Sequence, residues 1–203
     1  MSRGRFVVFE GGDASGKSTQ AARLADWLRE SGRVVHETFE PGAGATGAVI
    51  RELLLHGPDS IAPTTEALLM AADRAQHVAA EIEPALARGE WVVCDRYVPS
   101  SVVYQGVVRG LGVEIVEELS RIATQGLAPD LVLVLDVTDD VAAARQGTEP
   151  DRLEREGAEF HAAVRRAYRD LAPAHGWVVV DANAAVDDVA ARVRAAVAPL
   201  LAG

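Results

Sequence analysis

The sequence of 203 residues predicts an α/β fold in which a five-stranded parallel sheet is covered by helices on both faces. Three observations carry this prediction. Short apolar runs recur along the chain, stretches with helical periodicity fill most intervals between them, and a glycine-rich turn follows the first run. Continuous apolar runs are typical of strands buried on both faces. The runs span residues 5–9, 34–39, 91–95, 131–136 and 177–181.

The first run leads into a turn suited to hold phosphate. Residues 11–18 read Gly-Gly-Asp-Ala-Ser-Gly-Lys-Ser, which matches the pattern G-x-x-x-x-G-K-[ST]. In this pattern backbone N–H groups point inward, Lys17 reaches the β- and γ-phosphates and the Ser18 hydroxyl ligates Mg²⁺. A glycine turn that binds nothing is the alternative. The motif predicts a three-layer P-loop NTPase fold, with ATP bound by Gly11, Gly12, Asp13, Ala14, Ser15, Gly16, Lys17, Ser18 and Thr19.

Helices are expected between the runs. The first begins at Ser18 and ends at Gly32, and its apolar face comprises Ala21, Leu24, Ala25 and Leu28. The glycine- and alanine-rich stretch 41–47 is expected to be a loop beside the site. The interval 64–88 is mostly helical, and Pro84 is expected to bend or interrupt it. The last helix repeats Val186, Val189, Val193, Val197 and Leu200 after an expected cap region at 181–183.

Composition limits the function. The length fits one domain, residues 1–203, and no run approaches the ~18 apolar residues of a membrane span, so we expect a cytoplasmic protein without a membrane partner. Cys94, the single cysteine, is expected to be a small buried apolar residue. A net charge of −10 argues against a broad nucleic-acid-binding surface but allows a small phosphorylated substrate held by a few local arginines.

Charged residues follow the strands at the edge where ligands of an open α/β sheet bind. Asp95 ends the third run and suits Mg²⁺ held through water beside the phosphate loop; capping of the next element is the alternative. Arg96 suits bidentate capture of a second phosphate, and a surface ion pair is its alternative. Asp136, after the fourth run, is expected to be mainly structural.

Residues 95–106 read Asp-Arg-Tyr-Val-Pro-Ser-Ser-Val-Val-Tyr-Gln-Gly and closely resemble the D-R-Y-x-x-S-x-x-A-Y-Q-G signature of bacterial thymidylate kinases. Residues 40–42 resemble part of that family's T-R-E-P-G-G-T loop, 71–77 its F-A-A-D-R-A-Q-H helix, and 151–154 the D-R-[FI]-E end of its lid. The resemblance spans roughly the whole chain. It implies a dTMP kinase that transfers a phosphoryl group from ATP to dTMP, and a homodimer.

The resemblance also implies roles for single residues. Asp13 is expected to contact the 3′-hydroxyl of the sugar, Arg74 to read the carbonyl edge of thymine and Arg96 to hold the acceptor phosphate. The pocket is completed by Phe39, Met70, Tyr97, Ser101, Tyr104 and Gln105. Tyr104 is suited to exclude a 2′-hydroxyl. A helix-surface pair for Arg74 and simple core packing for Tyr104 are the alternatives.

The chain departs from the family at two positions of this pocket. Phe39 stands where the family has an arginine, which removes one cation that faces phosphate. Met70 replaces the aromatic residue on which thymine stacks, and a thioether is a looser platform than a ring. We therefore expect weaker or less selective dTMP binding than with an aromatic residue there.

The phosphate loop itself lacks the arginine that some thymidylate kinases carry, because Ala14 and Ser15 occupy its variable positions. The catalytic cation is therefore expected from a short lid at about 142–155, where Arg145 or Arg152 would close onto the transferred phosphate. A solvated lid surface is the alternative.

Two other functions stay open. A related P-loop kinase could act on another nucleotide or on a nucleoside, although Arg74 and the segment 104–106 favour a monophosphate acceptor. A regulatory relative could bind nucleotide without turnover. A GTPase switch should carry an N-K-x-D sequence, which this chain lacks.

Overall fold

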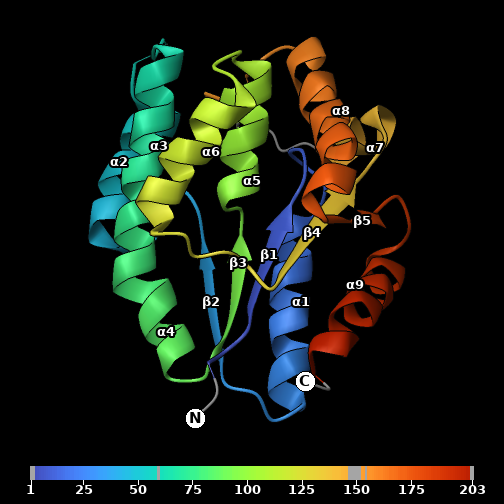
Figure 1. The fold of residues 1–203 in the computed structure, drawn as a ribbon. Helices are drawn as coiled ribbons and strands as arrows, with labels where there is room; N and C mark the ends of the chain where they lie inside the picture. The colour runs from blue at the N-terminus through green and yellow to red at the C-terminus, as the bar shows by residue number, and fades with distance from the viewer. Residues whose placement is uncertain (1–2, 59, 146–151, 154, 202–203) are drawn as a thin grey trace.

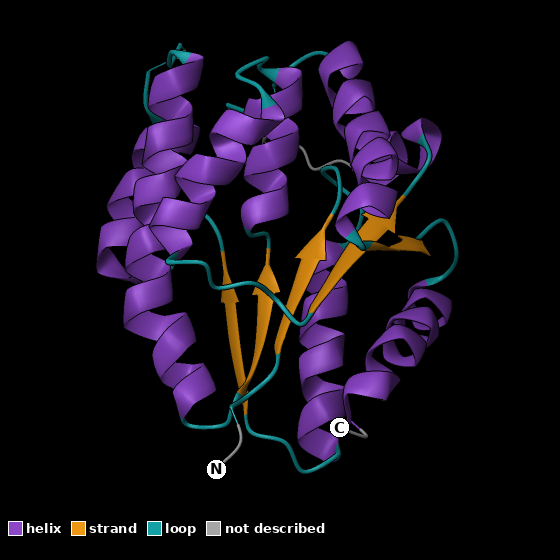
Figure 2. Ribbon diagram, in the orientation of Figure 1, coloured by secondary structure: helices purple, strands orange, loops and turns teal. Residues whose placement is uncertain are grey.

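Five parallel strands form the centre of the fold, and helices cover both faces of the sheet (Figure 1; Figure 2). The computed structural model describes residues 3–58, 60–145, 152–153 and 155–201. The strands are β1 (Phe6–Glu10), β2 (Val35–Phe39), β3 (Trp91–Asp95), β4 (Leu131–Asp136) and β5 (Val178–Asp181). Their order in the sheet is β2-β3-β1-β4-β5. Each matches a predicted run to within one residue, so the predicted sheet is confirmed.

The helices divide between the two faces. The α-helices are α1 (Lys17–Glu30), α2 (Gly44–His56), α3 (Pro63–His77), α4 (Glu83–Ala87), α5 (Val98–Ser101), α6 (Val113–Thr124), α7 (Asp139–Arg145), α8 (Ala158–His175) and α9 (Val186–Leu201), and two π-helical segments are η1 (Val78–Ile82) and η2 (Val102–Val108). Helices α1 and α9 pack on one face of the sheet, and η1, α4, η2 and α8 pack on the other.

Side chains of β1 alternate between two cores. Phe6 and Val8 join the cluster under η2 and α8, whereas Val7 and Phe9 join the cluster under α1 and α9. This follows from the two-residue period of a strand. All four side chains are fully buried, and so is Cys94, whose predicted core position is confirmed. The central strand is therefore rigidly held, and the phosphate loop that follows it starts from a fixed point.

The structure differs from the expected helix pattern in two places and agrees with it in a third. The expected loop at 41–47 ends earlier, because α2 begins at Gly44. The expected interruption near Pro84 is present, because the π-helical segment η1 separates α3 from α4 and Pro84 lies in the first turn of α4. Residues 181–183 do not cap α9. The Asp181 carboxylate accepts the backbone N–H of Asn183, and the side-chain oxygen of Asn183 accepts the backbone N–H of Thr138. No helix in the described ranges is long and apolar enough to cross a membrane.

Candidate active site

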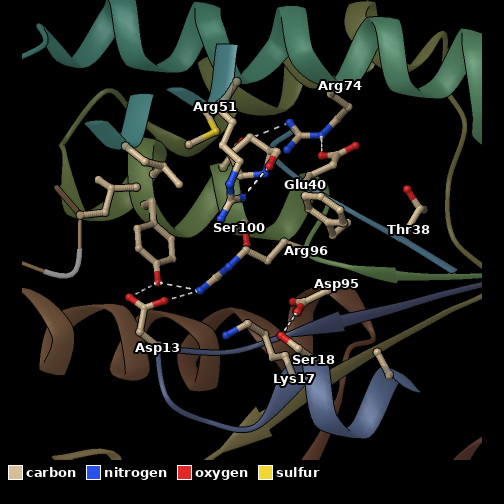
Figure 3. A pocket seen from close by; sticks show the side chains of 18 of the residues that line it. Asp13, Lys17, Ser18, Thr38, Glu40, Arg51, Arg74, Asp95, Arg96 and Ser100 are labelled. Carbon is tan, nitrogen blue, oxygen red and sulfur yellow. Dashed lines mark hydrogen bonds and ion pairs between the residues drawn. The ribbon is translucent and has the colours of Figure 1, made fainter. Parts of the chain in front are cut away.

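The carboxyl ends of β1, β2 and β3 meet at one cavity of about 590 Å³ (Figure 3). The parallel register aligns Phe9 of β1 with Asp95 of β3, so the loops after these strands lie side by side. The cavity is lined by the predicted site residues Asp13, Ala14, Gly16, Lys17, Ser18, Thr19, Phe39, Met70, Arg74, Asp95, Arg96, Ser101, Tyr104 and Gln105. Gly11, Gly12, Ser15, Tyr97, Arg145 and Arg152 are predicted site residues that do not belong to this lining.

The phosphate loop takes its shape from two glycines and the lysine. Gly11 and Gly16 have positive φ angles of 134° and 92°, which side chains rarely adopt. Lys17 is 7% exposed and its ammonium donates to the carbonyl of Gly12 at 2.9 Å. Burial and the nearby Arg96 lower the pKa of Lys17 to about 8. The loop therefore holds a buried amine whose charged form a bound anion would stabilise.

Ser18 and Asp95 meet at the mouth of the loop. The Ser18 hydroxyl donates to Asp95 Oδ2 at 2.5 Å. The other carboxylate oxygen, Oδ1, is buried and has no hydrogen-bond partner in the described part of the chain. Mg²⁺ prefers oxygen ligands and binds beside phosphates through one or two carboxylates. The pair fits that ion, because a hydroxyl and an unsatisfied carboxylate oxygen lie together next to the phosphate loop.

Arg96 lines the same cavity as Lys17. Its φ angle is 73°, and its Nη1 donates to Gly11 O and Ser100 Oγ, each at 3.2 Å. Its Nη2 forms a short ion pair with Asp13, whose other oxygen accepts the Tyr104 hydroxyl at 3.3 Å. Burial alone would raise the pKa of Asp13, but Arg96 and Lys17 lower it below its ordinary value. Arg96 is thus a half-buried group of the cavity rather than a surface ion pair.

A buried carboxylate that the sequence did not reveal holds this arrangement. Glu10 is fully buried at the end of β1 and accepts the backbone N–H of Tyr97 at 2.8 Å, the Ser100 hydroxyl at 2.6 Å and the Tyr168 hydroxyl at 2.7 Å. Burial raises the pKa of Glu10, although Arg96 and the three donors oppose this. These bonds fix the turn after β3, from which Arg96 extends. A carboxylate directly after an apolar strand was the available signal.

Arg74 occupies the far end of the cavity. It is 2% exposed, and it donates to Glu40 Oε2 at 2.8 Å, Ser101 Oγ at 3.0 Å and the carbonyl of Tyr97 at 3.0 Å. It is therefore no helix-surface residue. Tyr97 contributes to the site through this carbonyl, because its ring lies in the core 5.0 Å from that of Phe6.

Arg51 is a cavity residue that sequence reasoning missed. It extends from α2, donates to the carbonyl of Pro41 at 2.7 Å and lies over the ring of Phe39, 5.6 Å from its centre. A cation therefore lies beside Phe39, the position where the sequence resemblance leads us to expect an arginine. The sequence signal was weak, since a single arginine in an amphipathic helix is ordinarily a surface residue.

The two lid arginines have other partners in this structure. Arg145, at the end of α7, donates to the carbonyl of Ala182 at 3.1 Å. Arg152 is 7% exposed and donates to Leu54 O and to Glu66 Oε2, each at 2.7 Å. The rest of the predicted lid includes residues 146–151 and 154, which lie outside the described residues. Contact with a transferred phosphate would require either arginine to leave these partners.

The chain is similar to known proteins over most of its length. A family model described as thymidylate kinase matches residues 9–193. Similar proteins include thymidylate kinases of Leifsonia xyli subsp. xyli, 53% identical over 94% of this chain and 93% of that protein, and of Clavibacter sepedonicus, 49% identical over 95% and 93%. A thymidylate kinase of Synechococcus sp. strain RCC307 is 46% identical over 95% of this chain and 94% of that protein.

Proposed function

This chain belongs to the thymidylate kinase family, and from that premise we propose how its residues divide between two nucleotides. It is a dTMP kinase, which transfers a phosphoryl group to dTMP and yields dTDP. ATP is the proposed donor, bound by residues 11–19, with Lys17 at its β- and γ-phosphates. Ser18 and Asp95 would hold Mg²⁺, which supplies charge neutralisation at the donor phosphates. The observation that carries this division is that Lys17 and Arg96 line one cavity from the segments that follow two neighbouring strands, β1 and β3.

The acceptor is assigned to the other half of the cavity. Arg96 would hold the phosphate of dTMP, Asp13 would accept the 3′-hydroxyl, and Tyr104, whose hydroxyl already reaches Asp13, would exclude a 2′-hydroxyl. Arg74 and the lining residues Met70, Ser101 and Gln105 would surround the base, and Arg51 adds a cation beside Phe39. Catalysis then rests on positioning and on neutralising charge, because phosphoryl transfer offers little covalent chemistry to assist.

A nucleotide panel tests the assignment. Enzyme, Mg-ATP and one of dTMP, dUMP, dCMP or thymidine are mixed, and ADP formation is followed in a coupled assay. We expect rapid ADP formation with dTMP and slower formation with dUMP and dCMP. Turnover of thymidine instead of dTMP would indicate a nucleoside kinase, and binding without turnover would indicate a regulatory relative.

Replacing Met70 by phenylalanine should tighten the acceptor site. Stacking of a base on an aromatic ring contributes about 1–3 kcal/mol, and a thioether contact contributes about 0.3–1.5 kcal/mol. We expect the KM for dTMP to fall about fivefold and the preference for dTMP over dUMP to rise. An unchanged KM together with unchanged discrimination against dUMP would contradict this expectation.

We propose that a lid arginine approaches the transferred phosphate. If so, removal of that arginine should lower kcat. Alanine at Arg145 or Arg152 should lower kcat about 10²–10³-fold if that residue is the catalytic cation. Melting temperatures are measured in parallel, because Arg152 also pairs with the buried carboxylate of Glu66. If both variants keep near-normal kcat, no lid arginine is the catalytic cation.

The pKa of Lys17 predicts a pH dependence. Only its ammonium form attracts the donor phosphates, and its pKa in the free enzyme is about 8. The value of kcat/KM for ATP should therefore be level near pH 7 and fall as the pH rises through 8. Because a bound phosphate favours the charged form, ATP binding should take up protons at about pH 8.5. Calorimetry in two buffers of different ionisation enthalpy measures this uptake; its absence would refute the assignment.

A homodimer is also proposed, and exposed apolar side chains support it. Helix α3 packs against α2 and against α6 on one side of the fold (Figure 1). Five apolar side chains of these helices are each more than two-fifths exposed: Val49, Leu53, Leu68, Ile115 and Ile122. Light scattering after size exclusion would reveal a monomer if this is wrong. The single domain, the cytoplasmic location and the absence of a nucleic-acid partner remain predictions.

A further inference from the structure

Helix α8 contacts the end of β1 and the start of the phosphate loop. His161 approaches Asp13, with 3.6 Å between Nδ1 and Oδ2, and Tyr168 donates to Glu10. Between them on the same helical face stands Arg165, one turn from each. This face of α8 therefore covers the start of the loop.

Arg165 packs directly on Gly12. A Cβ atom added to Gly12 would lie 3.0 Å from Cγ of Arg165, 3.7 Å from its Cδ and 4.0 Å from its Nη1. Gly12 is not among the residues with positive φ in the described chain, so its backbone conformation does not require glycine. The Arg165 side chain occupies the space beside Gly12, and it would have to shift by a few tenths of an ångström to admit a Cβ atom there. The carbonyl of Gly12 meanwhile accepts the ammonium of Lys17. Gly12 thus accepts a hydrogen bond from Lys17 and packs against the methylene stem of Arg165.

Asp139 holds Arg165 in this position. Its Oδ1 accepts Nε of Arg165 at 2.7 Å and Nη2 at 2.6 Å. The Arg165 side chain is only 9% exposed, whereas that of Asp139 is 68% exposed. Burial disfavours the charge of a guanidinium, and water screens the attraction of a solvated carboxylate. Asp139 therefore neutralises the charge of Arg165 only in part. Its remaining charge lies against the loop where the donor phosphates bind.

Three other arginines near the site have partners among the described residues. Arg96 pairs with Asp13 on the acceptor side, and Arg145 and Arg152 bond to carbonyls and to Glu66. The phosphate loop itself contributes Lys17 and no arginine. Arg165 is therefore placed to supply donor-side charge without any movement of the lid.

We propose that Arg165 is a positioning residue for the donor nucleotide: held by Asp139, it supports the phosphate loop at Gly12 and places positive charge behind the bound polyphosphate. The inference rests on the proposed donor site and does not depend on which lid arginine is catalytic. Since it acts through the loop, its effect should grow with the number of donor phosphates, which a purely structural role would not produce.

The test is a nucleotide affinity series. Dissociation constants of ATP, ADP and AMP are measured by calorimetry for the whole protein, for Arg165→Gln, for Arg165→Lys and for the control Arg166→Gln, an exposed neighbour on α8. We expect Arg165→Gln to weaken ATP about 10–30-fold and AMP less than threefold, with the KM for dTMP within twofold of the wild-type value. Arg165→Lys should recover most of the ATP affinity, and Arg166→Gln should change nothing.

Equal losses for ATP and AMP, or ATP affinity within twofold of wild type, would overturn the proposal. Should Arg165→Gln fail to fold, Arg165→Lys decides it. ATP affinity within about fivefold of wild type then supports a charge effect, and a larger loss shared by AMP refutes it. Because binding is read without turnover, failure of the proposed kinase activity would show separately, as missing dTMP-dependent ADP formation by the wild type.

Discussion

Replacement of Lys17 by methionine is expected to lower kcat/KM for ATP about 10³–10⁴-fold without unfolding the protein. Lys17 is buried, it donates to the carbonyl of Gly12 within the phosphate loop, and it faces the proposed donor phosphates. Preorganised charge in a site shielded from water contributes far more to a transition state than the same charge in solvent. Removing it should therefore affect kcat more than the KM for dTMP.

The fold should tolerate this change. Burial lowers the pKa of Lys17, which shows that its surroundings disfavour the charged form in the free enzyme. A methionine has a similar length and no charge to bury, so the melting temperature should be unchanged or slightly higher. Steady-state kinetics and thermal unfolding of the same preparation separate the two effects. Activity within tenfold of wild type would place the donor phosphates elsewhere.

Replacement of Arg96 by glutamine should raise the KM for dTMP about 100-fold and lower kcat at least as much. Arg96 would both hold the acceptor phosphate and neutralise Asp13, with which it forms a short ion pair. Without the guanidinium, the charge of Asp13 would face an incoming phosphate dianion, and its pKa would rise. The affinity for ADP should change little, because the donor half keeps Lys17 and Ser18.

A double variant distinguishes these two contributions. Asp13→Asn removes the repelling charge, so Arg96→Gln with Asp13→Asn should lose less than the sum of the two single losses. Arg96→Lys should recover little, since an ammonium cannot reproduce the fork that binds Gly11, Ser100 and Asp13 together. A KM for dTMP within threefold of wild type in Arg96→Gln would exclude Arg96 from the acceptor site.

Local patterns predicted the sheet and half of the site. The strands came out within one residue because a parallel strand buried on both faces is a continuous apolar run. Asp95 and Arg96 could be placed because the carboxyl ends of β1 and β3 reach one edge. Residues 44–47 of the predicted loop 41–47 are helical, and they were mispredicted because glycine disfavours helix. Gly47 is nevertheless helical, and a Cβ there would lie 2.7 Å from Asp73, so close packing explains the glycine.

Partners far apart in the chain could not be predicted in this way. Glu66 and Arg152 are 86 residues apart, and Glu10 and Tyr168 are 158 apart. Arg51 and Arg165 belong to amphipathic helices, where an arginine is ordinarily a surface residue. Which of them turns toward the site depends on how α2 and α8 pack, and no local pattern records that packing.

The buried ammonium of Lys17 has a practical consequence, because it is the only lysine in the sequence. An amine with a pKa of about 8 presents far more free base near neutral pH than an ordinary lysine. A small acylating reagent would therefore label one side chain of this protein, and the fraction labelled would count phosphate loops left empty by nucleotide. Labelling of Lys17 would be read by mass spectrometry of the proteolytic peptide that contains it, because the α-amine at the N-terminus has a similar pKa and also reacts.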